Sequence, residues 1–230
     1  MNMATSPYEY IYQTLKKNGE PAWTGKGYER AWSNLSATLQ SFKQLGFLPL
    51  AGGRCLELGC GNGAMASLWL ARHGYRVEGV DISSTAIAWA KENFATEGLR
   101  GNFQQADVCA LDIFGPQRFD MVYDGSCLHC LIGEQRQLCF KHIQRIMTSD
   151  GIFIISSMCG EPKRSHDREN YDAEHYQLYE DGRPWRTLMP LDLLREELLK
   201  QGFAIFSELI HENPWWDHAT LCCRRTTSKE

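Results

Sequence analysis

We predict an α/β fold: a doubly wound sheet of seven strands with an antiparallel last strand, an N-terminal helical segment and a lid after the fifth strand. The first reason is that strand and helix patterns alternate between residues 54 and 157, as they do in doubly wound sheets. The second is that several of these strands are short and mostly apolar, which is typical of parallel strands covered on both faces. A length of 230 residues with 43% hydrophobic residues suits one large domain, or one domain with a cap.

Each element is predicted from its own pattern. The predicted strands cover residues 54–58, 76–80, 102–106, 119–123, 152–157, 203–210 and 218–223. The predicted helices cover residues 64–73, a segment capped by Ser83 or Ser84, residues 134–148, and a segment from Pro190 to Gly202. The helix at 134–148 carries an apolar stripe that extends to Met147. Because only a short turn joins the last two strands, we expect them to pair antiparallel.

Two segments are predicted to cover a sheet domain that spans residues 50–225. Residues 1–49 are rich in aromatic side chains, and their apolar residues between 35 and 42 recur at helical spacing. Residues 159–189 are polar and hold no clear apolar period. A loop of this length inside a compact domain is usually a functional lid or cap.

Composition argues against several classes of protein. The net charge of −4 disfavours a chain built mainly to bind nucleic-acid phosphates, since such domains are usually basic. No stretch of 18 apolar residues exists, and the N-terminus lacks the basic and apolar regions of a secretory signal, so we expect no membrane association. The nine cysteines indicate free thiols in a reducing cytoplasm. The oligomeric state, monomer or homodimer, stays open.

A glycine-rich turn follows the first strand, where backbone amides can approach a ligand closely. Gly59, Gly61 and Gly63 fit a dinucleotide as well as another nucleoside cofactor. Glu57 places a carboxylate beside the position of a pyrophosphate, which disfavours a nicotinamide dinucleotide but suits an ammonium or a sulfonium. Asp81 ends the second strand, at the position that binds ribose hydroxyls in either class.

Five stretches of the sequence, which include the glycine-rich turn, favour one of these ligand classes. They are Leu56-Glu-Leu-Gly-Cys-Gly-Asn-Gly63, Gly79-Val-Asp-Ile-Ser83, Gln105-Ala-Asp-Val108, Phe119-Asp-Met-Val-Tyr-Asp124 and Met147-Thr-Ser-Asp-Gly151. In order and spacing these stretches resemble the class I S-adenosylmethionine-dependent methyltransferases, over roughly residues 50–225. The resemblance implies a Rossmann-like sheet, the cofactor S-adenosyl-L-methionine and the product S-adenosyl-L-homocysteine.

The resemblance also implies which residues bind the cofactor. The candidates are Glu57, Gly59, Cys60, Gly61, Asp81, Ile82, Asp107, Val108, Asp124, Gly125 and Ser126. Glu57 and the glycine loop would surround the methionine part, and Asp81 would bind the ribose. Ile82, Asp107 and Val108 would contact the adenine, while the three residues after the fourth strand would line the remaining side.

The catalytic candidates, Tyr123 and His129, lie at the carboxyl end of the fourth strand, where open α/β sheets bind ligands. His129 could act as a general base, orient the acceptor, or be a structural histidine. The pair Cys127-x-x-Cys130 could be redox-active, half of a metal site, or two packed thiols. Because no second such pair exists, we predict no bound metal.

Further candidates for contact with the acceptor come from the two covering segments and from the cysteines. They are Trp23, Cys127, Cys159, His175, Tyr176, Trp185 and Trp215, with His166, Arg186 and Trp216 as neighbours. Taken singly, each aromatic or charged residue is more often packed or on the surface. Together they could line a pocket for a small molecule, and Cys159 could be a third thiol for a thiophilic substrate such as arsenite.

Three functions follow from these observations. The first is a cytoplasmic methyltransferase that acts on a small molecule by in-line displacement. Its acceptor is an oxygen or nitrogen atom, or else a thiol, selenide or metalloid. The second is a nicotinamide-dependent oxidoreductase, and the third is a protein that binds the cofactor without turnover. The absence of an Asn/Asp-Pro-Pro-Tyr motif after the fourth strand lowers the expectation of a nucleic-acid acceptor.

Overall fold

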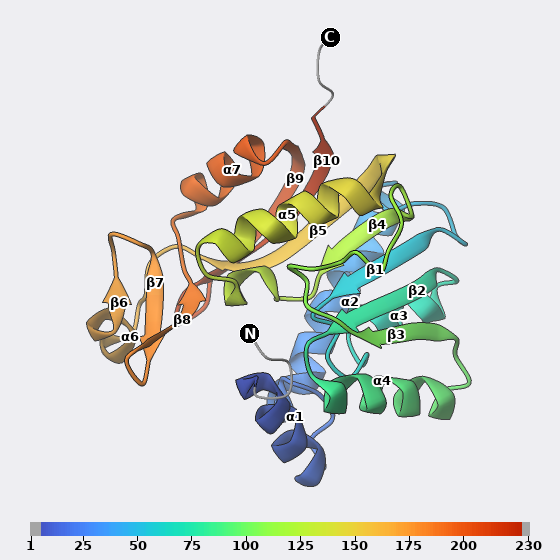
Figure 1. Ribbon diagram of the computed structural model, residues 1–230, viewed down its shortest axis with the longest axis horizontal. Helices are drawn as coiled ribbons and strands as arrows, with labels where there is room; N and C mark the ends of the chain where they lie inside the picture. Colours follow the sequence, from blue (N-terminus) through green and yellow to red (C-terminus); the bar gives the residue numbers. More distant parts are fainter. Residues whose placement is uncertain (1–5, 227–230) are drawn as a thin grey trace.

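The computed structural model describes residues 6–226 and has the predicted doubly wound sheet (Figure 1). Its strands are β1 (Arg54–Leu58), β2 (Arg76–Asp81), β3 (Gly101–Gln105), β4 (Phe119–Asp124), β5 (Met147–Cys159), β9 (Phe203–His211) and β10 (Asp217–Arg225). They lie in the order β3-β2-β1-β4-β5-β10-β9, and β10 runs antiparallel to both of its neighbours. From β1 the chain adds β2 and β3 on one side, and it then returns to add β4 on the other side of β1. Open α/β sheets bind ligands at the point where the strand order reverses in this way.

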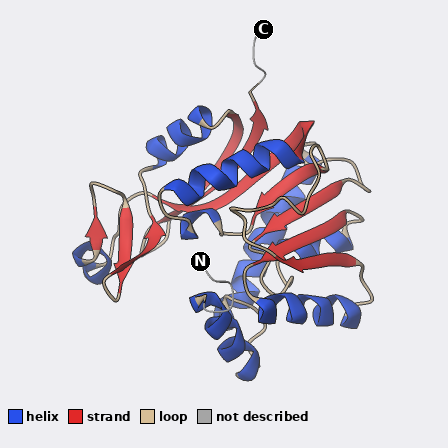
Figure 2. Ribbon diagram, viewed as in Figure 1, coloured by secondary structure: helices blue, strands red, loops and turns tan. Residues whose placement is uncertain are grey.

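Helices cover both faces of the sheet (Figure 2). They are α2 (Tyr28–Gln44), α3 (Ala66–Arg72) and α4 (Ser84–Thr96) on one face, and α5 (Glu134–Ile146) and α7 (Leu191–Lys200) on the other. Each face has its own apolar cluster, and the adjacent Cys222 and Cys223 of β10 belong to opposite clusters, as side-chain alternation along a strand requires. All nine cysteines are free thiols. Within residues 6–226, no helix is both long and apolar enough to cross a membrane.

Helix α5 ends at Ile146, so the prediction that places Met147 in this helix is wrong. The carbonyls of Arg145 and Ile146 accept hydrogen bonds from the backbone amides of Gln117 and Arg118, at 3.0 and 2.7 Å. These amides belong to the segment that enters β4, so the bonds align the end of the helix with that strand. Met147 therefore begins β5, which is 13 residues long and exceeds the predicted apolar run.

The N-terminal segment is helical, as predicted, and is attached to α4; residues 1–5 lie outside the described part of the chain. It contains α1 (Pro7–Lys17), the short 3-10 helix η2 (Gly25–Gly27) and α2. Glu9 accepts hydrogen bonds from the Ser83 hydroxyl at 2.7 Å and the Thr85 amide at 3.3 Å, at the start of α4, where amides need partners. Burial raises the pKa of Glu9, but hydrogen bonds from Thr85 and Ser83 outweigh it and hold this pKa at about 2. Tyr12 packs on Trp89 and completes the attachment.

Residues 159–189 form a folded cap instead of a long loop. The cap contains α6 (Ser165–Glu169) and an antiparallel sheet of β6 (Tyr171–Asp172), β7 (Gln177–Glu180) and β8 (Arg183–Thr187). These strands are only two to five residues long, which explains why the sequence shows no apolar period. Leu178 and Leu188 attach the cap to Met158 of β5. In Figure 1 the cap, in orange, projects beyond the main sheet on the side where α1 lies.

Candidate functional site

A cavity of about 1480 Å³ lies at the carboxyl ends of β1, β2 and β4. Its floor is the glycine loop and the segments that follow β2, β3 and β4, and its cover comes from α1, Trp23 and β8. A pocket for one small ligand usually measures about 300–1,000 Å³. The volume therefore accommodates a nucleoside cofactor and a second small molecule together.

The glycine loop adopts a backbone that brings other segments very close to it. Gly59 and Gly61 have φ values of 61° and 54°, in the left-handed region that favours glycine. A Cβ atom on Gly59 would lie 2.7 Å from the Cβ of Cys127, and one on Gly61 would lie 2.5 Å from the hydroxyl of Tyr12. The loop thus forms a narrow bed between the segment after β4 and helix α1.

Glu57 lies on the cavity wall and also holds the start of α3. Its Oε2 accepts a hydrogen bond from the Ser67 amide at 2.7 Å and another from the Ser67 hydroxyl. Its Oε1 faces Gly125, because a Cβ there would lie 2.8 Å from this oxygen. Burial raises the pKa of Glu57 to about 7, although the bonds from Ser67 oppose the shift. The carboxyl group is therefore costly to ionise unless a cation comes near.

Asp81 lies on the same wall, at the end of β2. Its carboxylate accepts hydrogen bonds from the amides of Gly61 and Ser83, both at 2.9 Å. Burial raises the pKa of Asp81 to about 6, against the effect of these bonds. Among the described residues, no lysine or arginine forms an ion pair with Asp81 or Glu57. Two buried acids without a cation suit a positively charged ligand and would repel a pyrophosphate.

The other predicted cofactor residues line the cavity with one exception. Cys60, Ile82, Asp107, Val108, Gly125 and Ser126 all contribute to the wall. Ser126 has a φ of 66°, which is rare for a residue with a side chain and is often found at functional sites.

Asp124, the exception, does not line the cavity. Its Oδ1 accepts hydrogen bonds from the amides of Cys127 and Leu128, both at 2.8 Å, and its buried Oδ2 has no partner among the described residues. Since successive side chains of a strand face opposite sides, Tyr123 reaches the cavity and Asp124 does not. Burial raises the pKa of Asp124 to about 7. Its carboxyl group shapes the loop after β4 instead of facing a ligand.

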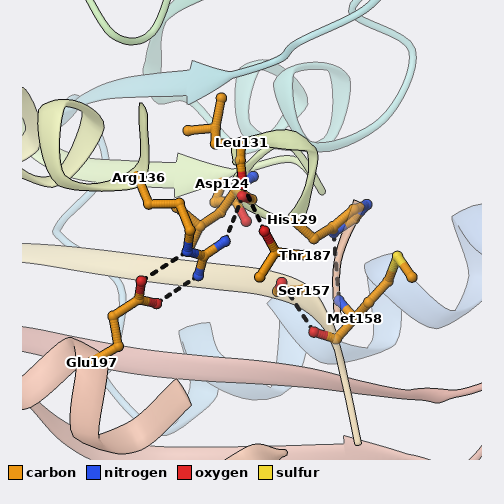
Figure 3. A network of polar contacts seen from close by, with 9 residues as sticks. Asp124, His129, Leu131, Arg136, Ser157, Met158, Thr187 and Glu197 are labelled. Carbon is orange, nitrogen blue, oxygen red and sulfur yellow. Dashed lines mark hydrogen bonds and ion pairs between the residues drawn. The ribbon is translucent and has the colours of Figure 1, made fainter. Parts of the chain in front are cut away.

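His129 lies on the cavity wall as a buried, neutral imidazole. Its Nδ1 accepts a hydrogen bond from the Met158 amide at 3.4 Å (Figure 3), so the ring proton resides on Nε2. Burial, and secondarily the charge of Arg186, lowers the pKa of His129 well below its ordinary value. His218 faces it with ring centres 6.5 Å apart, and burial lowers the pKa of His218 to about 4. This wall offers hydrogen-bond donors and only weak bases.

The phenol and thiols near His129 remain protonated. Burial raises the pKa values of Tyr123, Cys127 and Cys130, all of which line the cavity. Cys159 does not join them, because it packs in the apolar cluster beneath α5 and α7. Among the described residues, no three of the histidine, cysteine, aspartate and glutamate side chains are arranged to hold a metal ion. The structure therefore does not bring Cys159 together with Cys127 and Cys130 as a three-thiol site.

Aromatic side chains from α1 and the cap meet above this wall. Tyr8 stacks on Trp185 with ring centres 5.6 Å apart, and Trp23 lies 5.4 Å from Tyr12 and 6.0 Å from Tyr8. Nη1 of Arg186 donates a hydrogen bond to the Tyr8 hydroxyl at 2.8 Å. The sequence predicts Trp23, Trp185 and Arg186 as candidates but misses the two tyrosines. Tyr8 and Tyr12 are four residues apart, which places both on one face of a helix, and this spacing is the signal in the sequence that points to them.

The remaining residues predicted to contact the acceptor lie away from the cavity. His175 is exposed and pairs with Asp172 at 2.8 Å, and Tyr176, which the sequence also predicts, does not reach the wall. Trp215 packs under Arg164, whose guanidinium lies 4.8 Å from the ring centre. His166 and Trp216 also lie outside the wall. Only β8 and the β7–β8 turn of the cap face the cavity, which limits the cap's contribution to that hairpin.

Comparisons with known proteins identify relatives of this chain. Residues 55–151 match the family described as "Methyltransferase domain". The chain is 30% identical over 123 residues to an uncharacterized methyltransferase of Schizosaccharomyces pombe, which covers 54% of this chain and 83% of that protein. It is 39% identical over 79 residues, or 34% of its length, to ribosomal RNA small subunit methyltransferase C of Alcanivorax borkumensis, but spans only 22% of that relative.

A solved structure resembles the chain over nearly its whole length. It is the Burkholderia thailandensis 1,6-didemethyltoxoflavin-N1-methyltransferase with bound 1,6-didemethyltoxoflavin and S-adenosylhomocysteine, at a TM-score of 0.67 and 20% identity. The match covers 97% of this chain and 92% of that one, so it extends to the N-terminal segment and the cap. The likeness shows a shared fold.

Proposed function

Because the chain belongs to the class I S-adenosylmethionine-dependent methyltransferases, we propose that it methylates a small-molecule acceptor by in-line displacement. The observation that carries this proposal is the contact of α1 with β8 across the cavity, through Tyr8 and Trp185. Together with a volume suited to two small ligands, this contact supports an enclosed ternary complex. Residues 1–49 and 159–189 would then act as the lid over it.

The residues of the floor suit the cofactor of this family. S-adenosylmethionine, when bound, supplies an electrophilic methyl group on a sulfonium. Glu57 offers a carboxylate to its positive charges, and Asp81 offers one to its ribose hydroxyls. The narrow loop of Gly59 and Gly61 admits its methionine part. Asp107 and Val108 offer a polar and an apolar contact for the adenine. The carboxylate of Glu57 disfavours a nicotinamide dinucleotide, the alternative that the glycine loop alone left open.

The acceptor wall contributes orientation and exclusion of water more than proton transfer. His129 holds its proton at Nε2 and would donate a hydrogen bond to the acceptor, since Nδ1 is already engaged by Met158. Tyr123, whose pKa burial raises, would remain a donor as well. This arrangement favours an acceptor that attacks without losing a tightly held proton.

A soft acceptor is the second candidate, and the lowered pKa values of His129 and His218, which burial makes weak bases, favour it. A thiolate, a selenide or a reduced metalloid attacks a sulfonium methyl without a general base. Cys127 and Cys130 place sulfur atoms on the same wall, where they would make soft contacts with such an atom. We further propose a cytoplasmic location, which the nine free thiols support.

The proposal is tested first by titrating the protein with S-adenosylhomocysteine in a calorimeter. Asp81→Asn should weaken binding by roughly tenfold or more, whereas Asp120→Asn is the matched control, because Asp120 caps the Arg54 amide outside the cavity. Absence of binding by the wild-type protein would overturn the proposal.

The second step uses S-adenosylmethionine with a labelled methyl group. The protein is incubated in parallel with a fractionated small-molecule extract and with ribosomal RNA, and mass spectrometry locates the label. Label in a small molecule supports the proposal and identifies the attacking atom. Label in RNA would overturn the small-molecule acceptor while leaving the cofactor assignment intact.

A further inference from the structure

Arg186 of β8 is a buried cation on the acceptor side of the cavity. It is 8% exposed and lines the wall. Its Nη1 donates to the Tyr8 hydroxyl at 2.8 Å and to the Trp185 carbonyl at 2.9 Å. Within residues 6–226, no carboxylate forms an ion pair with it, and its Nε and Nη2 make no hydrogen bond.

Arg136 shows what a buried arginine of this protein otherwise does. It is 4% exposed, and its Nε and Nη2 bind both carboxylate oxygens of Glu197 at 2.8 and 2.6 Å (Figure 3). Its Nη1 donates to the Leu128 carbonyl at 2.7 Å. The two arginines use Nη1 in the same way, but the opposite edge of Arg186 has no anion. Burying an unpaired guanidinium is unfavourable, so a vacant planar edge points to an anionic ligand.

Aromatic rings lie close to the Arg186 guanidinium. The guanidinium carbon lies 3.9 Å from the centre of the Trp185 ring and 5.6 Å from that of Tyr8. The Trp185 ring lies against a face of the cation and offsets part of the cost of burying it. The Tyr8 hydroxyl accepts a hydrogen bond from Nη1, and neither contact supplies the in-plane acceptors that Nε and Nη2 need. An anion in the plane of the guanidinium can accept both.

Acidic and basic side chains lie on different walls of the cavity. The acidic side chains Glu57 and Asp81 lie on the glycine-loop wall, whereas Arg186 lies on the wall of the cap. Burial lowers the pKa of His129 and the Arg186 charge adds to this shift, whereas burial raises the pKa of Cys130 and the Arg186 charge opposes it. The field of Arg186 therefore reaches the part of the cavity where we place the acceptor. Glu180 at the end of β7 and Asp181 in the β7–β8 turn are exposed and also border the cavity, but within residues 6–226 neither pairs with Arg186.

We propose that the acceptor carries an anionic group, a carboxylate or a phosphate monoester, which Arg186 binds through Nε and Nη2. The ring or other planar part that carries this group lies among Tyr8, Trp23 and Trp185. The anion anchors the acceptor at the cap wall and leaves its nucleophilic atom on the side of His129. This inference rests on the proposed function, because it names the substrate class of the same cavity.

The test uses four probes that share a phenyl ring and differ in charge: benzoate, phenyl phosphate, benzamide and benzylamine. Each is titrated calorimetrically into the wild-type protein, with and without saturating S-adenosylhomocysteine. The anionic probes should bind about tenfold or more tightly than benzamide, and benzylamine should bind no better than benzamide. The stronger of the two anions distinguishes a carboxylate acceptor from a phosphate acceptor.

Two variants of Arg186 decide whether the preference comes from this residue. Arg186→Gln should abolish the preference for anions, and Arg186→Lys should keep a reduced preference, because it retains the charge without the planar edge. Arg164→Gln is the matched control, since Arg164 also covers a tryptophan ring but lies outside the cavity. If Arg186→Gln does not fold, the weakened preference of Arg186→Lys still tests the site.

The inference would be overturned if neither benzoate nor phenyl phosphate bound the wild-type protein more tightly than benzamide, or if both Arg186 variants kept an unchanged preference for anions. Failure of the proposed function looks different, because S-adenosylhomocysteine would then not bind at all. In that case the titrations without it still show whether Arg186 selects anions.

Discussion

Replacement of Glu57 by glutamine removes a titrating group from the buried wall of the cavity. The amide oxygen of glutamine can still accept the hydrogen bond from the Ser67 amide, so the start of α3 keeps its partner. In the wild-type protein the pKa of Glu57 rises from 4.5 when unfolded to about 7 when folded. Between these pH values the folded state therefore binds one proton more than the unfolded state, and stability falls as pH rises.

The size of the effect follows from this window. Each pH unit between the two pKa values costs the wild-type protein about 1.4 kcal/mol. Over the window from 4.5 to about 7 the difference from Glu57→Gln should reach on the order of 3 kcal/mol. The variant should thus be the more stable protein at pH 8, and its advantage should shrink towards pH 4.5.

Chemical denaturation of both proteins at pH 4.5, 6 and 8 measures the difference in the free energy of unfolding. Glu97→Gln is the control, since Glu97 forms an exposed pair with Arg72. In calorimetry, Glu57→Gln should bind S-adenosylmethionine roughly 10- to 100-fold more weakly at pH 8, with little difference at pH 5. A stability difference that is independent of pH, or that favours the wild type more as pH rises, would refute the reasoning.

Three further predictions concern the bed, the core and the acceptor wall. Gly59→Ala should destabilise the protein by about 1–3 kcal/mol and weaken binding of S-adenosylhomocysteine, because the new Cβ would lie 2.7 Å from the Cβ of Cys127. An unchanged melting temperature and an unchanged affinity would contradict this prediction. Arg136→Met should cost about 3–5 kcal/mol in chemical denaturation by leaving Glu197 unpaired, and a second change, Glu197→Gln, should recover part of the loss. His129→Gln should slow turnover of the acceptor found by labelling by less than about tenfold at saturating cofactor. The rate of the wild-type protein should not rise through pH 6.5, because the His129 imidazole is already neutral. A hundredfold loss of rate in the variant would instead indicate that His129 acts as a general base.

The sequence predicts well which strand-end residues line the floor of the cavity, because the position of a residue at a strand end decides where it lies. Parallel strands align their carboxyl ends at one edge, so Glu57, Asp81 and Asp107 converge on the cavity however the rest of the chain folds. Asp124 also ends a strand, yet its side chain points away from the cavity. Asp124 is still paired within the sheet, and alternation turns Tyr123 towards the cavity and Asp124 away from it. A strand that is apolar on both faces does not show in its sequence which of these faces borders the cavity.

The acceptor wall was less predictable, because it forms from segments distant in the chain. Tyr8 and Arg186 are 178 positions apart and meet only once α1 is attached to α4 and the cap to β5. His175 and Trp215 are of the same residue types as the histidines and tryptophans that line the cavity, but they do not line it themselves. Aromatic composition identified the right segments without deciding which face of each would turn inward.

The link between Tyr8 and Arg186 also bears on how such a protein can diversify. The segment matched by the methyltransferase family, 55–151, contains Glu57 and Asp81, whereas Tyr8, Trp185 and Arg186 lie on either side of it. Under the proposed function, exchange of the flanking segments would change the contacts to the acceptor and leave Glu57 and Asp81 in place. A hydrogen bond and a pair of stacked rings join these two segments, so a chimera that takes only one of them would lose both contacts.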